Sequence, residues 1–225
     1  MPEKKGGNSS KSAGAGESLV VTETYPSIIG EGTAAGLPGV IVRLTGCNLR
    51  CTYCDTRYAY EGGKRTGLSE LVKKIERHRL RRVLVTGGEP LLQTPAVCGL
   101  LQTLIENGHQ TMIETNGTQD IKSVPQQTLI IMDMKTPGSG NTSLTAVDNL
   151  DWLKPTDNIK FVLTGRADYT WSRNINKRKK LDQRFRVIFS PAYGMLEPSE
   201  LAGWILEDKL NVRLGLQLHK YMKVR

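Results

Sequence analysis

The sequence predicts an α/β protein built as an incomplete (β/α) barrel of about six parallel strands. Short apolar runs rich in β-branched residues recur along the chain, and helix-like stretches lie between several of them. Strands that alternate with helices favour a mostly parallel sheet with right-handed crossovers. About six or seven strands are too few to close an eight-stranded barrel. We therefore expect functional residues at the C-terminal ends of the strands.

The first 18 residues are polar and rich in Lys, Ser and Gly, so we expect a flexible tail over 1–18 and a single domain over 19–225. The predicted strands are Val40–Leu44, Val83–Thr86, Thr111–Thr115, Leu129–Met134, Ile159–Leu163, Val187–Phe189 and Leu214–Leu218. The predicted helices are Ser69–Arg79, Thr94–Asn107 and Pro198–Leu210. Gly108 is a suitable stop for the second helix, and Cys98 within it has the spacing of a core residue.

Composition excludes several classes of protein. The 225 residues are 38% hydrophobic and contain no apolar run of about 18 residues, so we expect a folded core and no membrane span. The N-terminus lacks an apolar segment typical of a signal peptide, which favours the cytoplasm. The net charge of +9 favours anionic partners without choosing among nucleic acid, a phosphorylated cofactor, a carboxylate substrate and an acidic redox protein.

Three of the four cysteines, Cys47, Cys51 and Cys54, form a C-x3-C-x2-C loop directly after a predicted strand. Three thiolates at this spacing can hold three irons of a [4Fe–4S] cluster and leave the fourth iron open. A structural zinc site requires a fourth ligand, and no other His or Cys lies nearby in the sequence. The spacing favours the cluster, and it leaves zinc or three unrelated cysteines as alternatives.

Two turn motifs follow later predicted strands. The first is Gly87-Gly88-Glu89-Pro90, in which two glycines allow close approach of the backbone and Glu89 can accept a hydrogen bond from an ammonium group. The second is Glu114-Thr115-Asn116-Gly117. Each is common in ordinary turns. The cysteine loop and the two turns together, with Tyr53 before the last cysteine, resemble the S-adenosylmethionine (SAM) site of the radical SAM superfamily.

Within that superfamily, residues 21–225 resemble the 7-carboxy-7-deazaguanine synthase family. The matching pieces, besides the motifs above, are Ile29-Gly30-Glu31-Gly32, Val42-Arg43-Leu44, Cys54-Asp55-Thr56, Lys160-Phe161-Val162 and Gln217-Leu218-His219-Lys220-Tyr221. The resemblance implies conversion of 6-carboxy-5,6,7,8-tetrahydropterin to 7-carboxy-7-deazaguanine with loss of ammonia, in 7-deazapurine (queuosine) biosynthesis. It implies a [4Fe–4S] cluster, SAM as a regenerated cofactor, and Mg²⁺.

The resemblance also implies roles for individual residues. Cys47, Cys51 and Cys54 hold the cluster, and Thr56 offers a hydroxyl to Mg²⁺. The implied SAM-binding residues are Tyr53, Cys54, Asp55, Gly88, Glu89, Glu114, Asn116, Asp133, Met134, Lys135, Ser190, Pro191, Ala192 and Tyr193. The implied substrate-binding residues are Ile28, Ile29, Gly30, Glu31, Arg43, Thr86, His219 and Arg225, the last through its terminal carboxylate. Glu31, Arg43 and His219 are the implied catalytic residues, with the planar fork of Arg43 suited to the substrate carboxylate.

The chain departs from the family pattern at two places. Ile29 replaces a common Gln, which removes one polar contact to the pterin, and Asp133-Met134-Lys135 replaces a common Ser-Pro-Lys. The expected partners are a flavodoxin or similar reductant and a second copy in a homodimer, with no membrane and no direct nucleic acid. Two alternatives are another radical SAM enzyme, such as an activase or mutase, and a zinc-stabilised basic RNA-binding module. The basic segment Arg173–Arg186 is interpreted as a solvated loop or helix face, with reductant docking and RNA binding as alternatives.

Overall fold

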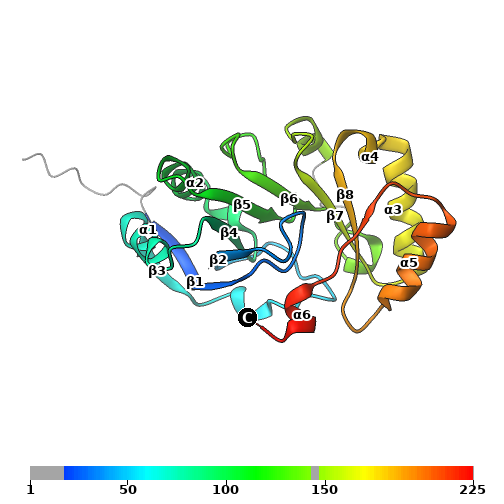
Figure 1. Ribbon diagram of the computed structural model, residues 1–225, viewed down its shortest axis with the longest axis horizontal. Coiled ribbons are helices and arrows are strands. Elements are labelled where there is room, and N and C mark those ends of the chain that lie inside the picture. The colour runs from blue at the N-terminus through cyan, green and yellow to red at the C-terminus, as the bar shows by residue number, and fades with distance from the viewer. Residues whose placement is uncertain (1–17, 143–146, 225) are drawn as a thin grey trace, which may run out of the picture.

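The computed structural model describes residues 18–142 and 147–224. Within these residues a single sheet has the strand order β3-β1-β2-β4-β5-β6-β7-β8-β9. Neighbouring strands from β2 to β9 pair in parallel, and β1 pairs antiparallel with both β2 and β3. The sheet does not close on itself (Figure 1), so the incomplete parallel barrel is confirmed.

The strands are β1 Ser18–Ile28, β2 Pro38–Leu44, β3 Lys64–Gly67, β4 Arg82–Gly87, β5 Gln110–Thr115, β6 Leu129–Asp133, β7 Asn158–Leu163, β8 Arg186–Pro191 and β9 Arg213–Leu214. The helices are α1 Leu68–Glu76, α2 Ala96–Glu106, α3 Arg166–Lys179, α4 Leu181–Arg184, α5 Pro198–Glu207 and α6 Leu218–Met222. Most of the parallel strands are linked by a crossover that contains a helix, as alternating strands and helices require. None of the helices within the described residues is long and apolar enough to cross a membrane.

Alternation along the strands separates the core from the inside of the open barrel. In β2, Val40, Val42 and Leu44 belong to the main core, which also includes buried residues of α1, α2, α3 and α5. The residues between them, Ile41 and Arg43, face the concave side. The main core therefore lies on the helical side of the sheet and leaves the concave side free for a site.

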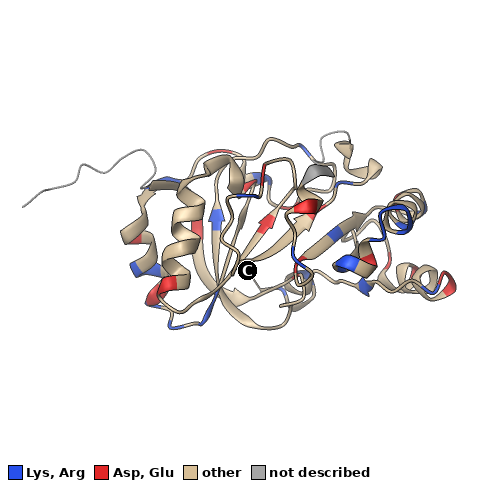
Figure 2. Ribbon diagram, turned by 90° about the horizontal axis from the view of Figure 1, so that it is seen from above, with Lys and Arg blue, Asp and Glu red and all other residues tan. Residues whose placement is uncertain are grey.

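The concave side carries one polar residue on each of five neighbouring strands, near the C-terminal end in β2, β4, β5 and β6 and in the middle of β7. We call this set the polar ring: Arg43 of β2, Thr86 of β4, Glu114 of β5, Asp133 of β6 and Lys160 of β7. The strand register makes Arg43 the direct partner of Thr86, and Asp133 the direct partner of Lys160. Figure 2 shows charged positions of both signs on the strands in the middle of the molecule, as well as on the helices. The expected concentration of functional groups at strand ends is thus present.

The predicted elements differ from the structure at several places. Leu214–Leu218 is not a strand: only Arg213–Leu214 pairs with the sheet, and the chain then forms α6. The long strand β1, the short strand β3 and helix α3 were not predicted. The predicted helix Ser69–Arg79 ends three residues early at Glu76, where the chain turns and Arg79 adopts a positive φ of 54°. The division into a tail over 1–18 and a domain over 19–225 stays a prediction, since residues 1–17 lie outside the described residues.

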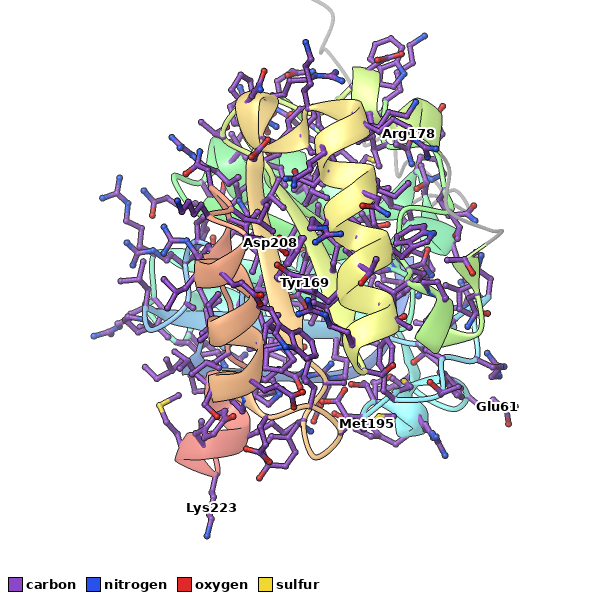
Figure 3. The ribbon with its side chains drawn as sticks, turned by 90° about the vertical axis from the view of Figure 1, so that its right-hand side faces the viewer. Glu61, Tyr169, Arg178, Met195, Asp208 and Lys223 are labelled. Atoms are coloured by element: carbon purple, nitrogen blue, oxygen red, sulfur yellow. The ribbon has the colours of Figure 1, made fainter. Side chains whose placement is uncertain are left out.

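The basic segment is partly structural. Arg173 of α3 pairs with Asp208, and Arg184 donates to the carbonyl of Leu150. The four consecutive cations from Lys177 to Lys180 are exposed at the C-terminal end of α3, where they complement the helix dipole. This agrees with a solvated helix face. Figure 3 shows Arg178 at one end of the molecule and Met195 and Lys223 at the other.

Candidate active site

The cysteine loop leaves β2 and packs against the glycine turn that leaves β4. The amide of Gly88 donates to the carbonyl of Leu44 at 3.2 Å, and the amide of Glu89 donates to the carbonyl of Gly46 at 2.7 Å. A Cβ atom at Gly88 would collide with the backbone of Gly46, and Gly87 has a φ of +139°. The two glycines are therefore required for contact between the turn and the cysteine loop.

Glu89 is fully buried beneath this turn. Its carboxylate accepts hydrogen bonds from the amide of Leu91 at 3.0 Å, the hydroxyl of Thr115 at 2.9 Å and the amide of Asn116 at 2.6 Å. Burial raises the pKa of Glu89, and these hydrogen bonds act against that rise. Glu89 thus ties the first turn motif to the second, and its side chain has no surface in the cavity described below.

The three thiols of the cysteine loop are half-buried and face one cavity. The side-chain amide of Asn141 donates to the sulfur of Cys51 at 3.6 Å, and that of Asn116 lies 4.0 Å from the sulfur of Cys47. Burial raises the pKa of the Cys47 and Cys51 thiols, which a bound metal would reverse by coordinating the thiolates. Amide donors at cysteine sulfurs are typical of iron–sulfur sites.

The arrangement of the thiols fits a cluster better than a single ion. Among the residues that the structure describes, no three His, Cys, Asp or Glu side chains are grouped so as to hold one metal ion. A zinc site needs its ligands to converge on one point, whereas each thiolate of a [4Fe–4S] cluster binds a different iron. The cysteine loop therefore fits the cluster that its spacing predicts.

The cavity has a volume of about 660 Å³ and extends from the cysteine loop across the polar ring to α6. A volume of this size accommodates a cofactor and a small substrate together. The thiols line one part of the wall, and Arg43, Tyr25 and Tyr58 line another. All five residues of the polar ring also line it. The cavity therefore joins the predicted SAM side and the predicted substrate side in one space.

Arg43 is held in place by two residues of β1. Its Nε donates to Glu23 at 2.8 Å, and one terminal nitrogen donates to the hydroxyl of Tyr25 at 3.1 Å. Tyr58, in the short 3-10 helix Arg57–Ala59 after the cysteine loop, donates its hydroxyl to the same Glu23 oxygen at 2.8 Å and lies beside the guanidinium. Burial by itself would lower the pKa of Arg43, but the interactions with Tyr25, Tyr58 and Glu23 outweigh it and raise that pKa. The guanidinium is thus a fixed positive charge with further N–H donors for a ligand.

A group of alternating charges crosses the bottom of the cavity. This cavity cluster consists of Glu31, Asp133, Lys135 and Lys160. Lys135 pairs with Asp133 at 2.9 Å, Lys160 lies 3.7 Å from the same Asp133 oxygen, and Lys160 also pairs closely with Glu31. Burial alone would lower the pKa of Lys160, but the carboxylates of Glu31 and Asp133 outweigh it and raise that pKa. Lys160 is therefore a permanent cation between two carboxylates.

Glu114 lies next to this cluster. It accepts a hydrogen bond from the hydroxyl of Thr86 at 2.7 Å. Burial and the nearby carboxylate of Glu31 raise the pKa of Glu114. The cavity thus contains a carboxyl group whose environment favours its neutral form.

Helix α6 is fixed to the cysteine loop and to the loop after β1. Lys220 pairs with Asp55 at 2.7 Å, and His219 lies 3.7 Å from the same carboxylate. The amide of Leu218 donates to the carbonyl of Gly30 at 3.0 Å, and a Cβ atom at Gly30 would collide with His219. Figure 1 shows α6, in red, beside the cyan segment that follows β2. His219 thus reaches the cavity from a helix and not from a strand.

The cavity wall contains most of the residues that the sequence singled out. These are Ile28, Gly30, Glu31, Arg43, Cys47, Cys51, Tyr53, Cys54, Asp55, Thr56, Thr86, Gly88, Glu114, Asn116, Asp133, Lys135, Ala192, Tyr193 and His219. Five others are not in the wall: Ile29, Glu89, Met134, Ser190 and Pro191. Arg225 lies outside the described residues, next to Val224, which does line the cavity.

The five residues outside the wall have clear local reasons. Ile29 is fully buried in a small apolar cluster with Ile41, Leu84 and Met112, so its side chain has no surface in the cavity. Met134 belongs to the main core, because it points to the opposite side of the strand end from Asp133 and Lys135. Ser190 and Pro191 are buried at the end of β8, next to the cavity-lining Ala192.

Several cavity residues were not singled out as site residues by the sequence. They are Glu23, Tyr25 and Tyr58 around Arg43, and Lys160, Gln217 and Lys220 around Glu31 and Asp55. Lys160 had a detectable signal, since it is a lysine in the middle of an apolar strand. Tyr58 had none, because an exposed tyrosine in a loop is unremarkable in a sequence.

Comparisons with known proteins agree with this geometry. Residues 41–137 match the family model described as the radical SAM superfamily. The chain is 39% identical over 218 residues to a 7-carboxy-7-deazaguanine synthase of Koribacter versatilis, covering 91% of this chain and 96% of the relative. It is 36% identical over 217 residues to a synthase of the same name from Methanospirillum hungatei, covering 96% and 91%. The crystal structure of QueE from Escherichia coli has the same fold, with a TM-score of 0.73, 22% identity, and coverage of 89% and 94%.

Proposed function

This chain belongs to the 7-carboxy-7-deazaguanine synthase family of the radical SAM superfamily, and we propose that it converts 6-carboxy-5,6,7,8-tetrahydropterin to 7-carboxy-7-deazaguanine with loss of ammonia. A radical SAM enzyme uses a [4Fe–4S] cluster and SAM. The observation that carries the proposal is the single cavity that joins three half-buried thiols to Arg43 and Glu31. A carboxylated pterin needs a cation for its carboxylate and acceptors for its N–H groups, and this cavity offers both.

The cluster and SAM, when bound, supply a radical that abstracts a hydrogen atom from the substrate. Cys47, Cys51 and Cys54 hold the cluster in this proposal. The residues proposed to face SAM are Tyr53, Asp55, Gly88, Asn116, Asp133, Lys135, Ala192 and Tyr193, all of which line the cavity. Glu89 is proposed to hold the two turn motifs in position and not to contact SAM itself, since its carboxylate already accepts three hydrogen bonds.

On the substrate side, Arg43 is proposed to bind the pterin carboxylate through its remaining N–H groups. Glu31 is proposed to accept hydrogen bonds from the N–H groups of the pterin ring, with Gly30 and Thr86 forming the adjacent wall. His219 is proposed to contact the substrate from α6. These side chains bind and orient the pterin and exclude water from the reacting atoms.

Thr56 is the proposed Mg²⁺ ligand. Its hydroxyl donates to Asp55 at 2.9 Å and lies in the cavity wall, where an oxygen ligand suits a hard cation. We further propose, on the resemblance described above, a flavodoxin or similar small reductant, a homodimer and a cytoplasmic location. For the exposed cations at the end of α3 we propose a solvated helix face and not a docking surface, since Arg178 and Lys223 lie at opposite ends of the molecule (Figure 3).

The test is an anaerobic assay of the iron–sulfur-reconstituted protein with SAM, dithionite, Mg²⁺ and 6-carboxy-5,6,7,8-tetrahydropterin. Formation of 7-carboxy-7-deazaguanine, identified by mass and ultraviolet absorbance, is expected. Cleavage of SAM without consumption of the pterin would preserve the reaction class and overturn the substrate.

Two variants test the substrate side and the cluster side of the cavity separately. Arg43→Lys should raise the KM for the pterin about tenfold or more, because a lysine cannot reproduce the planar fork. Its cluster content and its SAM cleavage should remain. Cys51→Ser is the matched control and should lose both. Loss of the cluster in Arg43→Lys would contradict the role given to Arg43.

A further inference from the structure

We propose that Lys160 is a positioning residue that fixes the substrate side of the cavity to the SAM side. This inference rests on the proposed function. Lys160 lies on β7, and the other five residues of this strand are buried. Its side chain is only 10% exposed, and its ammonium group lies in the cavity. A buried lysine requires carboxylate partners, and the identity of those partners indicates what it does.

The two partners come from different halves of the site. Glu31 lies in the loop after β1, on the proposed substrate side, and Asp133 ends β6, on the proposed SAM side. Between them, the Lys160 ammonium contacts one oxygen of each carboxylate. Asp133 is further held by Lys135 at 2.9 Å. The chain of contacts therefore runs without interruption from the SAM side to the substrate loop.

Glu31 is held at both of its oxygens. Lys160 pairs with Oε2, and the side-chain amide of Gln217 donates to Oε1 at 2.8 Å. Gln217 immediately precedes α6, which carries His219. A carboxylate fixed at both oxygens has one orientation, which is what recognition of a flat pterin ring requires.

Removal of the Lys160 charge would leave three acidic side chains close together. Glu31 and Asp133 would lose their shared cation, and Glu114 lies beside them. Carboxylates in such a group repel one another or take up protons. Either response would change the position of Glu31, whereas the cysteine loop would keep all its contacts.

The structure thus assigns to Lys160 a role that acts through Glu31. The predicted consequence of Lys160→Met is a KM for the pterin that rises about tenfold or more, as expected when a charged hydrogen bond is lost. The cluster content and the affinity for SAM should stay within about threefold of the wild type. SAM cleavage should become uncoupled, with more SAM consumed per product formed.

The experiment compares the wild type, Lys160→Met and Lys160→Arg as reconstituted proteins. Pterin binding is measured anaerobically by titration calorimetry, in addition to KM and kcat, so that one readout does not depend on turnover. Lys160→Arg keeps the charge and should recover most of the pterin affinity. In the double variant with Glu31→Gln, Lys160→Met should add little further loss, because both changes remove the same contact.

Lys154 provides the matched control. It forms another lysine–aspartate pair, with Asp157 at 2.9 Å, just before the N-terminal end of β7. Lys154→Met should reduce stability and leave the pterin affinity unchanged. Equal loss of affinity in the two methionine variants would reduce Lys160 to a structural role and overturn the proposal.

The failures of the two proposals are distinguishable. A wild type that binds and converts the pterin, together with a Lys160→Met variant of unchanged pterin affinity, overturns only the role of Lys160. A wild type that does not bind the pterin overturns the proposed function. Lys160→Gln replaces the methionine variant if that variant does not fold, and unfolding of both would also count against a positioning role.

Discussion

Two groups of partly buried charges lie at different places in this molecule. The cavity cluster centres on Asp133, which is held by Lys135 and Lys160. The second group, which we call the flank cluster, centres on Asp208 after α5 and includes Tyr169 and Arg173 of α3. The two aspartate side chains have similar exposure, 16% and 21%. Their chemistry is nearly the same, and their surroundings are not.

The flank cluster is closed on itself. Asp208 accepts two hydrogen bonds from one terminal nitrogen of Arg173 at 2.9 and 3.0 Å, and Tyr169 contacts both Asp208 and the carbonyl of Trp204 at 2.6 Å. Arg166 covers the rings of Tyr169 and Trp204. Figure 3 shows Tyr169 and Asp208 between α3 and α5. These contacts join two helices, and none of these residues lines the cavity of the candidate site.

The cavity cluster instead draws its members from the loop after β1, the end of β6 and the middle of β7, and it faces a cavity of about 660 Å³. An ion pair therefore does not by itself indicate function. The two groups differ in whether their charged side chains line a cavity. The same substitution in each group should accordingly have different consequences, and the size of that difference tests the distinction.

The largest effect is expected for Asp133→Asn. Loss of this charge leaves two buried ammonium groups without their shared partner, which costs about 3 kcal/mol of stability. For a chain of this size, the Tm should fall by about 6–12 °C. Because Asp133 also lines the cavity, kcat/KM should fall by at least about tenfold. Differential scanning calorimetry measures the change in Tm, and the coupled SAM–pterin assay measures the change in kcat/KM. Wild-type values of both would contradict the proposed functional difference between the cavity cluster and the flank cluster.

A smaller effect is expected for Lys220→Met, at an ion pair on the rim of the cavity. The Lys220–Asp55 pair is 27% and 36% exposed, so its contribution to stability should be below about 1 kcal/mol. It nevertheless holds the helix that carries His219, and the KM for the pterin should rise about threefold to tenfold.

Salt provides a second readout for the rim. High ionic strength screens an exposed ion pair, so the wild-type KM should rise with salt and the Lys220→Met KM should not. Lys223→Gln, at an exposed cation just after α6, is the control and should behave as the wild type does. If Lys220→Met had the wild-type KM at all salt concentrations, the Lys220–Asp55 pair would have no role in pterin binding and would resemble the flank cluster.

The sequence was sufficient to predict the strands that are covered by helices. Apolar, β-branched runs such as Val83–Thr86 and Ile159–Leu163 became strands because both of their faces are buried. Strand β1 was not predicted, since Glu23, Thr24 and Pro26 interrupt its apolar pattern. Strand β3 pairs only with Ser18–Val21, so these three residues lie in the part of β1 that has a free edge, where a continuous apolar run is not needed.

The sequence predicted site residues whose spacing along the chain is set by the chemistry they perform. It did not predict which side chains packing turns toward the cavity. The thiols of the cysteine loop were found because a cluster fixes their separation. The packing of Ile29 against β2, β4 and β5, the contact of Gly30 with His219 and the burial of Glu89 depend on segments distant in the sequence. Arg43 was predicted, but its orientation by Glu23 required the pairing of β1 with β2.

A moderate effect confined to stability is expected for Tyr169→Phe. The Tyr169 side chain is fully buried, and its hydroxyl contacts the carbonyl of Trp204 and the carboxylate of Asp208. Loss of this hydroxyl should cost about 1 kcal/mol, which lowers the Tm by about 2–4 °C. The KM for the pterin and the cluster content should not change. A changed KM would show that the flank cluster also serves the cavity.

The smallest effect is expected for Asp208→Asn, and its sign depends on pH. Hydrogen bonds from Tyr169 and Arg173 lower the pKa of Asp208 below its ordinary value. A carboxyl group with a lower pKa in the folded protein stabilises it above the unfolded-state pKa of about 3.9. That contribution is lost as the pH falls through the folded-state value. The Tm of the wild type should therefore exceed that of Asp208→Asn slightly at neutral pH, and the gap should narrow in acid. A gap that widens in acid would mean that the Asp208 charge does not stabilise the contact between α3 and α5, and the flank cluster would then lose the structural role that sets it apart from the cavity cluster.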